Sequence, residues 1–287
     1  QGILYMPQRS YYWINVFTTQ QDQGNPLPVV MLEEPLSKTS MQQIAKMFNQ
    51  SETVFIEAPY SDCPELHIYT PMQELPFAGH PIIGALEVLN NLRPQKPVQQ
   101  IRCAAGVVSA YFDTSENIHW IKAPAMPTSK PSRLTIPLTS EMLGIEAQQI
   151  LHPPRWVNSG SEQLLVQIKD AAHIDQIKIN LPLFEEYATL YPGRSMIYLW
   201  AESPEGIYAR YLYLNNGALL EDSGTGSAAA NLGGWHLLQN SGDIAYRIQQ
   251  GTALKQECII YLKTIEQAIW IGGKNHPMGK GDIQWQD

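Results

Sequence analysis

The sequence predicts an α+β fold in two lobes, each with a sheet wrapped about a central helix. Two glycine-centred segments, residues 74–81 and 221–228, each follow a strand-like run and each open a helix-like run. The order helix, strand, strand, glycine loop, helix occurs once in each half of the 287-residue chain. The apolar content of 44% and the charged content of 16% are typical of globular domains.

The first half begins with two strand-like runs on either side of the turn Gly24-Asn25-Pro26. A helix follows, for which Thr39 and Gln42 resemble a capping box. A second helix is expected to start at Gly79-His80-Pro81, with Pro81 suited to its first position. The expected strands are apolar or alternating runs bounded by turn residues, at 11–17, 27–32, 53–57 and 66–70.

The second half repeats this order with a helix at 181–190 and another that carries Ala228, Leu232 and Trp235 on one run. Its expected strands are again short apolar runs, at 196–200, 207–214, 259–263 and 268–271, of which the last two are expected to close the chain. The segment 123–131 is rich in proline and lacks periodicity, which is typical of a linker.

We therefore predict an N-terminal lobe at 7–124, a linker at about 125–131 and a C-terminal lobe at 132–287, with the active-site cleft between the lobes. The first six residues take no part in this argument.

Composition restricts the possible partners. A formal charge of −8 argues against nucleic acid and against an anionic membrane, because both require a basic surface. No apolar run approaches the roughly 18 residues of a membrane span, so a soluble, cytoplasmic protein is expected. The three cysteines are scattered and odd in number, which predicts neither a disulfide framework nor a zinc site. We expect no metal and no cofactor.

An anion-binding site must then be built locally. Helix N-termini present unpaired backbone N–H groups and the positive end of the helix dipole. Two of them, one at each glycine segment, would favour a small acid such as a carboxylate.

Four ordered segments resemble the PhzF-type phenazine-biosynthesis family. They are Gly24-Asn25-Pro26, the run at 51–56, the segment 74–81, and Glu221-Asp222 followed by Thr225-Gly226-Ser227-Ala228. The resemblance covers nearly the whole chain. It implies a diaminopimelate-epimerase-like fold of two pseudo-symmetric lobes, each a curled, mostly antiparallel sheet around a central helix, and a homodimer.

The resemblance also implies a cofactor-independent isomerase that acts on a small carboxylate resembling dihydro-hydroxyanthranilate. In related epimerases and racemases of this fold, a cysteine precedes each glycine loop, and the two thiols act as acid and base. Here these positions are Ala78 and Ser223, so two-thiol racemisation is not expected. One glutamate that moves a proton agrees with the family.

Glu52 is the candidate for that glutamate, because one carboxylate can take a C–H proton and return it elsewhere on the substrate. From the residues alone, a solvated strand-edge glutamate remains the alternative. His80, at a helix start, could assist the proton transfer or bind the substrate carboxylate, or only bond local backbone. Asp222 could accept a hydrogen bond from substrate or orient His80, or only favour the helix start.

Five small or polar residues are expected to bind rather than react, since small side chains let backbone N–H groups approach a ligand. They are Asn25, Gly79, Thr225, Gly226 and Ser227. A tight turn explains the two glycines equally well, and for Asn25 the Asn-Pro turn is the preferred explanation.

Two alternatives stay open besides the proton-shifting isomerase. One is an epimerase or racemase that uses Glu52 with His80 or Asp222 in place of thiols, and the other is a non-catalytic metabolite-binding protein. Nucleotide and serine-hydrolase motifs are absent from the sequence. The chain departs from the family pattern at Ser223, where a proline is usual, and after Gly251, where a Gly-Arg-Pro run is missing. Both departures concern the substrate more than the fold.

Overall fold

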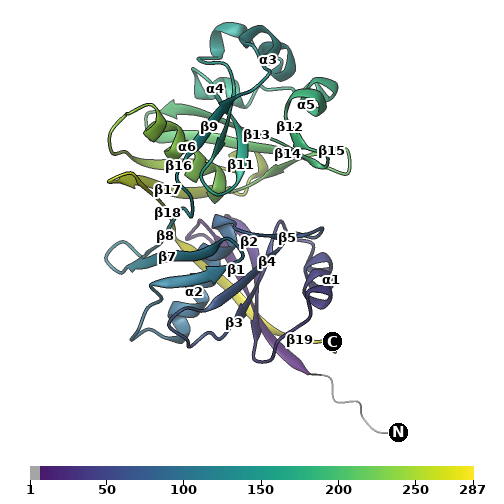
Figure 1. Ribbon diagram of the computed structural model, residues 1–287, viewed down its shortest axis with the longest axis vertical. Helices are drawn as coiled ribbons and strands as arrows, with labels where there is room; N and C mark the ends of the chain where they lie inside the picture. Colours follow the sequence, from purple (N-terminus) through teal and green to yellow (C-terminus); the bar gives the residue numbers. More distant parts are fainter. Residues whose placement is uncertain (1–6) are drawn as a thin grey trace. The chain divides into compact units, whose positions relative to one another are not determined.

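Two structural units, each with its own central helix, make up the computed structural model, which describes residues 7–287 (Figure 1). The first unit contains described residues 7–21, 25–122 and 273–287. The second contains residues 22–24 and 123–272. The first six residues, which the fold prediction left aside, lie outside the described range.

The central helix of the first unit is α2 (Gly79–Leu92), and nearly all of its residues are buried. A helix that is apolar all round belongs in a core, because it has no polar face to turn to water. It packs against strands of its own unit (Figure 1). These are β1 (Gln8–Val16), β2 (Asn25–Leu32), β3 (Thr53–Glu57), β8 (Ile118–Lys122) and β19 (Asn275–Gln284).

The sheet of the first unit runs in the order β19, β1, β2, β3, β4. Only β2 and β3 are parallel in this series, and α1 (Lys38–Phe48) connects them. Strand β4 also pairs antiparallel with β5 and, through the crossover of α2, parallel with β6. The antiparallel series β6, β7, β8 completes the unit. The remaining bounds are β4 (Glu65–Tyr69), β5 (Glu74–Leu75), β6 (Gln100–Cys103) and β7 (Gly106–Asp113).

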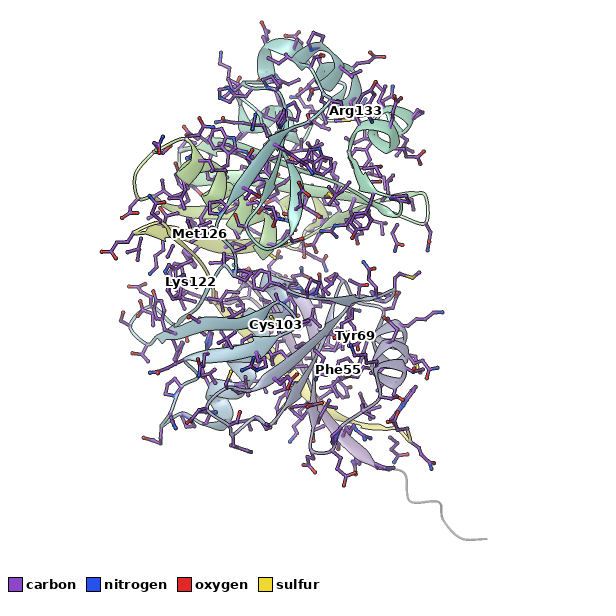
Figure 2. All side chains as sticks on the ribbon, viewed as in Figure 1. Phe55, Tyr69, Cys103, Lys122, Met126 and Arg133 are labelled. Carbon is purple, nitrogen blue, oxygen red and sulfur yellow. The ribbon has the colours of Figure 1, made fainter. Side chains whose placement is uncertain are left out.

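Helix α1 covers a separate apolar cluster of the first unit. Met41 and Ile44 of the helix are buried in it with Phe55 and Tyr69. The rings of Phe55 and Tyr69 meet edge to face at 5.8 Å, and both residues are labelled in Figure 2. The N-cap of α1 is Ser37, whose hydroxyl accepts from the Ser40 N–H at 3.1 Å. The predicted capping box at Thr39 was therefore wrong by two residues. Serine serves as well as threonine in this role, so either could have been chosen.

The second unit is built in the same way around α6 (Gly226–Leu238), which is also buried on most sides. Its strands run β9, β10, β11, β13, β14, with β11 and β13 parallel. Strand β14 pairs antiparallel with β15 and, through α6, parallel with β16, and β17 and β18 follow. The bounds are β9 (Thr128–Pro131), β10 (Arg155–Asn158), β11 (Glu162–Gln167), β13 (Arg194–Ser203), β14 (Gly206–Asn215), β15 (Ala218–Asp222), β16 (Ala245–Gln250), β17 (Cys258–Ile265) and β18 (Ala268–Gly273).

The two units thus share one topology, strand for strand, with α2 and α6 in corresponding places. This confirms the predicted α+β fold of two pseudo-symmetric lobes. Smaller elements occupy the stretch before β13 in the second unit. They are α3 (Ile136–Leu143), a short 3-10 turn (Ala147–Gln149), α4 (Ala171–Ile174), α5 (Leu181–Tyr187) and β12 (Thr189–Tyr191).

The outer strand of each unit corrects the predicted boundaries. Residues 128–131, expected within a linker, form β9, which pairs with β10 of the second unit. Residues 275–284, expected in the C-terminal lobe, form β19, which pairs with β1 along nine positions of the first unit from Gln8 to Val16. Proline in both segments, and glycine in the second, hide the strand pattern; they are tolerated because each strand needs pairing on only one edge.

The described helices, of which α2 is the longest, include none that is both long and apolar enough to cross a membrane.

Candidate functional site

The first unit brings three sequence-predicted residues together at one end of its parallel strand pair. Asn25 is the first residue of β2, and Glu52 directly precedes β3. Because β2 and β3 run parallel, both positions lie at the same end of the two strands, where the strands begin. Helix α2 begins at the same end of these strands with Gly79, and His80 is its second residue.

His80 is held between two oxygen atoms. Its Nδ1 lies 2.9 Å from Glu52 Oε2, and its Nε2 lies 3.2 Å from the backbone carbonyl oxygen of Asn25. The His80 side chain is 4% exposed and that of Glu52 is 18% exposed, so the carboxylate is the member of the pair that solvent or a ligand can reach. We call these two side chains the Glu52–His80 pair.

The partners of His80 determine how many protons the pair holds. A backbone carbonyl only accepts, so His80 Nε2 must carry a hydrogen atom. In neutral imidazole Nδ1 is then a bare acceptor, which faces a carboxylate oxygen. That contact is favourable only when one further proton lies between Nδ1 and Oε2. The pair is therefore either a protonated Glu52 beside neutral imidazole, or a Glu52 carboxylate beside imidazolium.

A second glutamate–histidine pair in the same unit has the opposite arrangement. Asn90 accepts from the Val98 N–H at 2.8 Å, which turns its amide NH₂ toward Nδ1 of His119 at 3.2 Å. His119 Nδ1 is thus the acceptor, and its Nε2–H donates to Glu87 at 2.8 Å.

This pair is satisfied without an extra proton. Burial by itself would raise the pKa of Glu87, but the hydrogen bond and electrostatic attraction of His119, with the hydrogen bonds from Asn91 and Asn275, outweigh it and hold that pKa below its ordinary value. The structure therefore holds Glu87 as an anion. The Glu87–His119 pair serves as an internal reference for the Glu52–His80 pair.

Asn25 takes part mainly through its backbone. Its side chain is buried, with the residue 3% exposed, and Ser51 Oγ lies 3.4 Å from its Oδ1. The carbonyl oxygen of the same residue fixes the His80 ring. Asn25 thus positions His80 in this unit through its backbone, and a role for its side chain in binding a ligand stays a prediction.

The second unit holds the other predicted residues in the turn from β15 to α6. Asp222 ends β15, and its Oδ2 accepts from Thr225 Oγ1 at 2.6 Å. Gln250, fully buried at the end of β16, donates to Thr225 Oγ1 and to the Asp222 carbonyl, both at 2.9 Å, and accepts from the Thr225 N–H at 3.1 Å. The turn is therefore fixed by one glutamine from a neighbouring strand.

The two acidic residues of this turn have different partners. Glu221 forms a two-point ion pair with Arg210, at 2.9 and 2.8 Å, and its side chain is 8% exposed. Both of its oxygens are occupied in this way. Asp222 is bonded to Thr225 and is the acidic candidate of the unit. His80, in the first unit, is bonded there to Glu52 and Asn25, and a role for Asp222 in orienting it stays a prediction.

The two departures from the family pattern meet beside this turn. A side chain on Gly251 would bring its Cβ within 2.5 Å of the Ser223 carbonyl oxygen, and its φ is +84°. Glycine is therefore required there. Ser223 is buried, and its Oγ lies 3.5 Å from the Gly24 carbonyl. The segment after Gly251 forms a short 3-10 turn, Thr252–Leu254.

Cys258 lies beside Ser223, although no cysteine belongs to either sequence motif. Burial first, and the charge of Asp222 second, raise the pKa of its thiol well above the ordinary value. Such a thiol stays protonated at neutral pH and is a poor base. Cys103 is also buried and Cys63 is partly exposed, and among residues 7–287 no disulfide joins any of the three.

Gly226 and Ser227 are the first two residues of α6, after the N-cap Thr225. Ser227 Oγ accepts a hydrogen bond at 2.9 Å from Gln163, a residue of β11. Gln163 and Gln250 were not singled out by the sequence. Gln250 stands next to Gly251, a pair visible in the sequence, whereas no pattern marks Gln163.

Within residues 7–287, no three His, Cys, Asp or Glu side chains are grouped as they would be around a metal ion.

Comparison with known proteins gives this arrangement a family context. The family model described as phenazine biosynthesis-like protein matches residues 14–279. An uncharacterized isomerase of Pasteurella multocida is 33% identical over 277 residues, which cover 96% of this chain and 93% of that protein. The trans-2,3-dihydro-3-hydroxyanthranilate isomerase of Pseudomonas chlororaphis is 43% identical over 76 residues, or 26% of this chain and 27% of that protein.

The fold has a close counterpart among solved structures. The crystal structure of a Bacillus anthracis phenazine biosynthesis protein of the PhzF family superimposes with a TM-score of 0.80 at 17% identity, covering 97% of this chain and 99% of that one.

Proposed function

This chain belongs to the phenazine biosynthesis-like protein family and is an isomerase; from this premise we propose that it shifts a proton between two carbon atoms of a small carboxylate. Glu52 moves the proton, and His80 as imidazolium holds Glu52 as the carboxylate that can accept it. The single observation that carries the proposal is the position of the His80 ring, with Nδ1 2.9 Å from Glu52 Oε2 and Nε2 3.2 Å from the Asn25 carbonyl oxygen.

The pair can perform both halves of such a reaction. In its ion-pair form the Glu52 carboxylate takes a proton from a substrate carbon, and the pair then holds one proton more than before. Glu52 returns this proton to a second carbon, which restores the starting state. No cofactor enters the proton balance. A general acid–base group of this kind contributes about 10²- to 10⁴-fold to the rate.

The substrate that we propose is a cyclic amino-carboxylate like trans-2,3-dihydro-3-hydroxyanthranilate. Its basis is the similarity to the isomerase of that name from Pseudomonas chlororaphis, which extends over 76 residues. Thr225, Gly226 and Ser227 bind the carboxylate in this proposal, because they start a helix whose first N–H groups favour an anion. Asp222 accepts a hydrogen bond from the substrate amino or hydroxyl group.

The test is proton NMR of the protein with trans-2,3-dihydro-3-hydroxyanthranilate in deuterated water. Wild type should incorporate deuterium or form the isomer, and Glu52→Gln should be slower by about 10²- to 10⁴-fold. Glu87→Gln is the matched control, because it makes the same change in the other glutamate–histidine pair of the same unit. If Glu52→Gln kept full turnover, or if Glu87→Gln lost as much, Glu52 would not be the proton carrier.

An epimerase would also exchange deuterium, so the product is analysed by chiral chromatography. Inversion of one stereocentre without a shifted double bond would identify that reaction. A ligand recovered unchanged and without deuterium would indicate a binding protein.

A further inference from the structure

A chain of buried amide groups in the second unit ends on Ser227. Asn231 of α6 is fully buried, and Gln163 of β11 is 2% exposed. Asn231 Oδ1 accepts from the Ser159 N–H at 2.7 Å, and its Nδ2 donates to the Ser161 carbonyl at 2.7 Å and to Gln163 Oε1 at 2.8 Å. Gln163 Nε2 then donates to Ser227 Oγ at 2.9 Å.

The direction of this chain follows from its backbone members. An N–H only donates, so the Ser159 N–H must face the oxygen of Asn231. The NH₂ group of Asn231 therefore faces Gln163, which must present its own oxygen to Asn231. The NH₂ group of Gln163 then faces Ser227. Neither amide can be reversed without placing two donors or two acceptors together in a buried site, which is costly.

The consequence is a hydroxyl group with a fixed role. Ser227 Oγ already accepts from Gln163, so its own proton points to another acceptor. Among residues 7–287 no group accepts that proton. We infer that Gln163 is a positioning residue, which holds the Ser227 hydroxyl as a hydrogen-bond donor to the carboxylate of the ligand. This inference rests on the proposed function, in which Ser227 binds that carboxylate.

A purely structural role explains the first part of the chain but not its last bond. Asn231 connects α6 to the turn between β10 and β11 without help from Gln163, through its bonds to Ser159 and Ser161. Gln163 is not needed for that connection. Its NH₂ group reaches Ser227, and Tyr211 OH lies farther away at 3.5 Å. The bond to Ser227 therefore points to a function at Ser227.

The experiment measures binding of anthranilate and of its neutral amide, 2-aminobenzamide, by calorimetry. Wild type should prefer the carboxylate. Ser227→Ala should weaken anthranilate by about tenfold or more, since a hydrogen bond to a charged group is lost. Gln163→Glu should do the same, because its carboxylate takes the Ser227 proton for itself. Binding of 2-aminobenzamide should change much less in both variants.

A double-mutant cycle separates positioning from general damage. Gln163→Met should weaken anthranilate in the wild-type background and have no further effect in the Ser227→Ala background. Gln149→Met is the matched control, because Gln149 is another buried glutamine of the second unit, bonded to Asp170. Gln163→Glu keeps the bond from Asn231 and serves if Gln163→Met does not fold.

The outcomes separate this inference from the proposed function. Additive effects in the cycle, equal losses for the carboxylate and the amide, or no carboxylate preference in wild type would overturn the role of Gln163. Deuterium exchange in wild type would uphold the proposed function even then. Conversely, a Gln163-dependent preference for anthranilate without any exchange into trans-2,3-dihydro-3-hydroxyanthranilate would support the positioning role and reject the isomerase chemistry.

Discussion

The two glutamate–histidine pairs should respond in opposite ways to the same substitution. Glu87 accepts from His119 at 2.8 Å, from Asn91 at 3.0 Å and from Asn275 at 3.4 Å. In Glu87→Gln one of the two oxygens becomes an NH₂ group that faces a donor, and the other loses its charge. Hydrogen bonds to charged groups contribute about 1.5–3 kcal/mol and neutral ones about 1 kcal/mol. We expect a loss of about 1–3 kcal/mol of unfolding free energy at pH 7.

Glu52→Gln should leave stability within about 0.5 kcal/mol of wild type. The NH₂ group of the new glutamine can donate to His80 Nδ1 in place of the proton that the pair shares. His80 keeps its bond to the Asn25 carbonyl. We therefore expect the substitution that slows the proposed reaction to be the one that spares stability.

The effect of Glu87→Gln should also depend on pH. The folded-state pKa of Glu87 lies below its ordinary value of 4.5, so between the two values the unfolded chain binds more protons and stability rises with pH. The contribution of the charge is complete above pH 4.5 and is lost as pH falls through the lowered folded value. The difference between wild type and Glu87→Gln should therefore be largest at neutral pH and shrink below pH 4.5.

Urea unfolding followed by tryptophan fluorescence, from pH 7 down to pH 3.5, measures these differences. Glu116→Gln is the control, because Glu116 is an exposed glutamate of the same unit. A Glu87→Gln effect no larger than that of the control, or one that did not change with pH, would refute the assignment of Glu87 as a bonded anion. A Glu52→Gln loss as large as that of Glu87→Gln would refute the shared proton of the Glu52–His80 pair.

Two further predictions concern the cores. Gly84→Ala should destabilise the protein by about 1–3 kcal/mol, because the new Cβ would lie 2.3 Å from Leu27 and 2.8 Å from Val16, both fully buried. This steric cost should exceed the preference of about 1 kcal/mol that alanine has for a helix. Thermal unfolding by circular dichroism measures the change, and a raised melting temperature would contradict the packing argument. In the native protein only the thiol of Cys63 should react rapidly with Ellman's reagent. Cys103 and Cys258 should react only after denaturation, since burial raises the pKa of these two thiols. Rapid reaction of two or three thiols would show that the buried ones open to solvent.

Local sequence determined the elements that carry their own pattern. The strand at 53–57 has the bounds that its apolar run predicts, and α2 and α6 begin at the two glycine segments. Periodicity and turn residues act over a few positions, so they can be read from letters alone. For the same reason the repeat of elements in the two halves predicted two lobes of one topology.

The outer strands could not be predicted in this way. Strand β19 reads Asn-His-Pro-Met-Gly-Lys-Gly-Asp-Ile-Gln, and β9 lies in a proline-rich stretch. Neither alternates, and both become strands because β1 and β10 offer an unpaired edge. Pairing between residues as distant as Gln8 and Gln284 is a property of the folded unit.

In the candidate site, too, the sequence determined which residues are candidates, and the tertiary structure determined their contacts. The sequence placed Glu52, His80 and Asp222 in motifs, since side chains of these types can move protons or bind polar groups. It could not say which groups they contact. Only the tertiary structure set His80 between Glu52 and the Asn25 carbonyl, and Gln163 against Ser227. Hydrogen bonds with a fixed direction decide where each proton lies, and they depend on atoms that distant segments bring within 3 Å or so of each other.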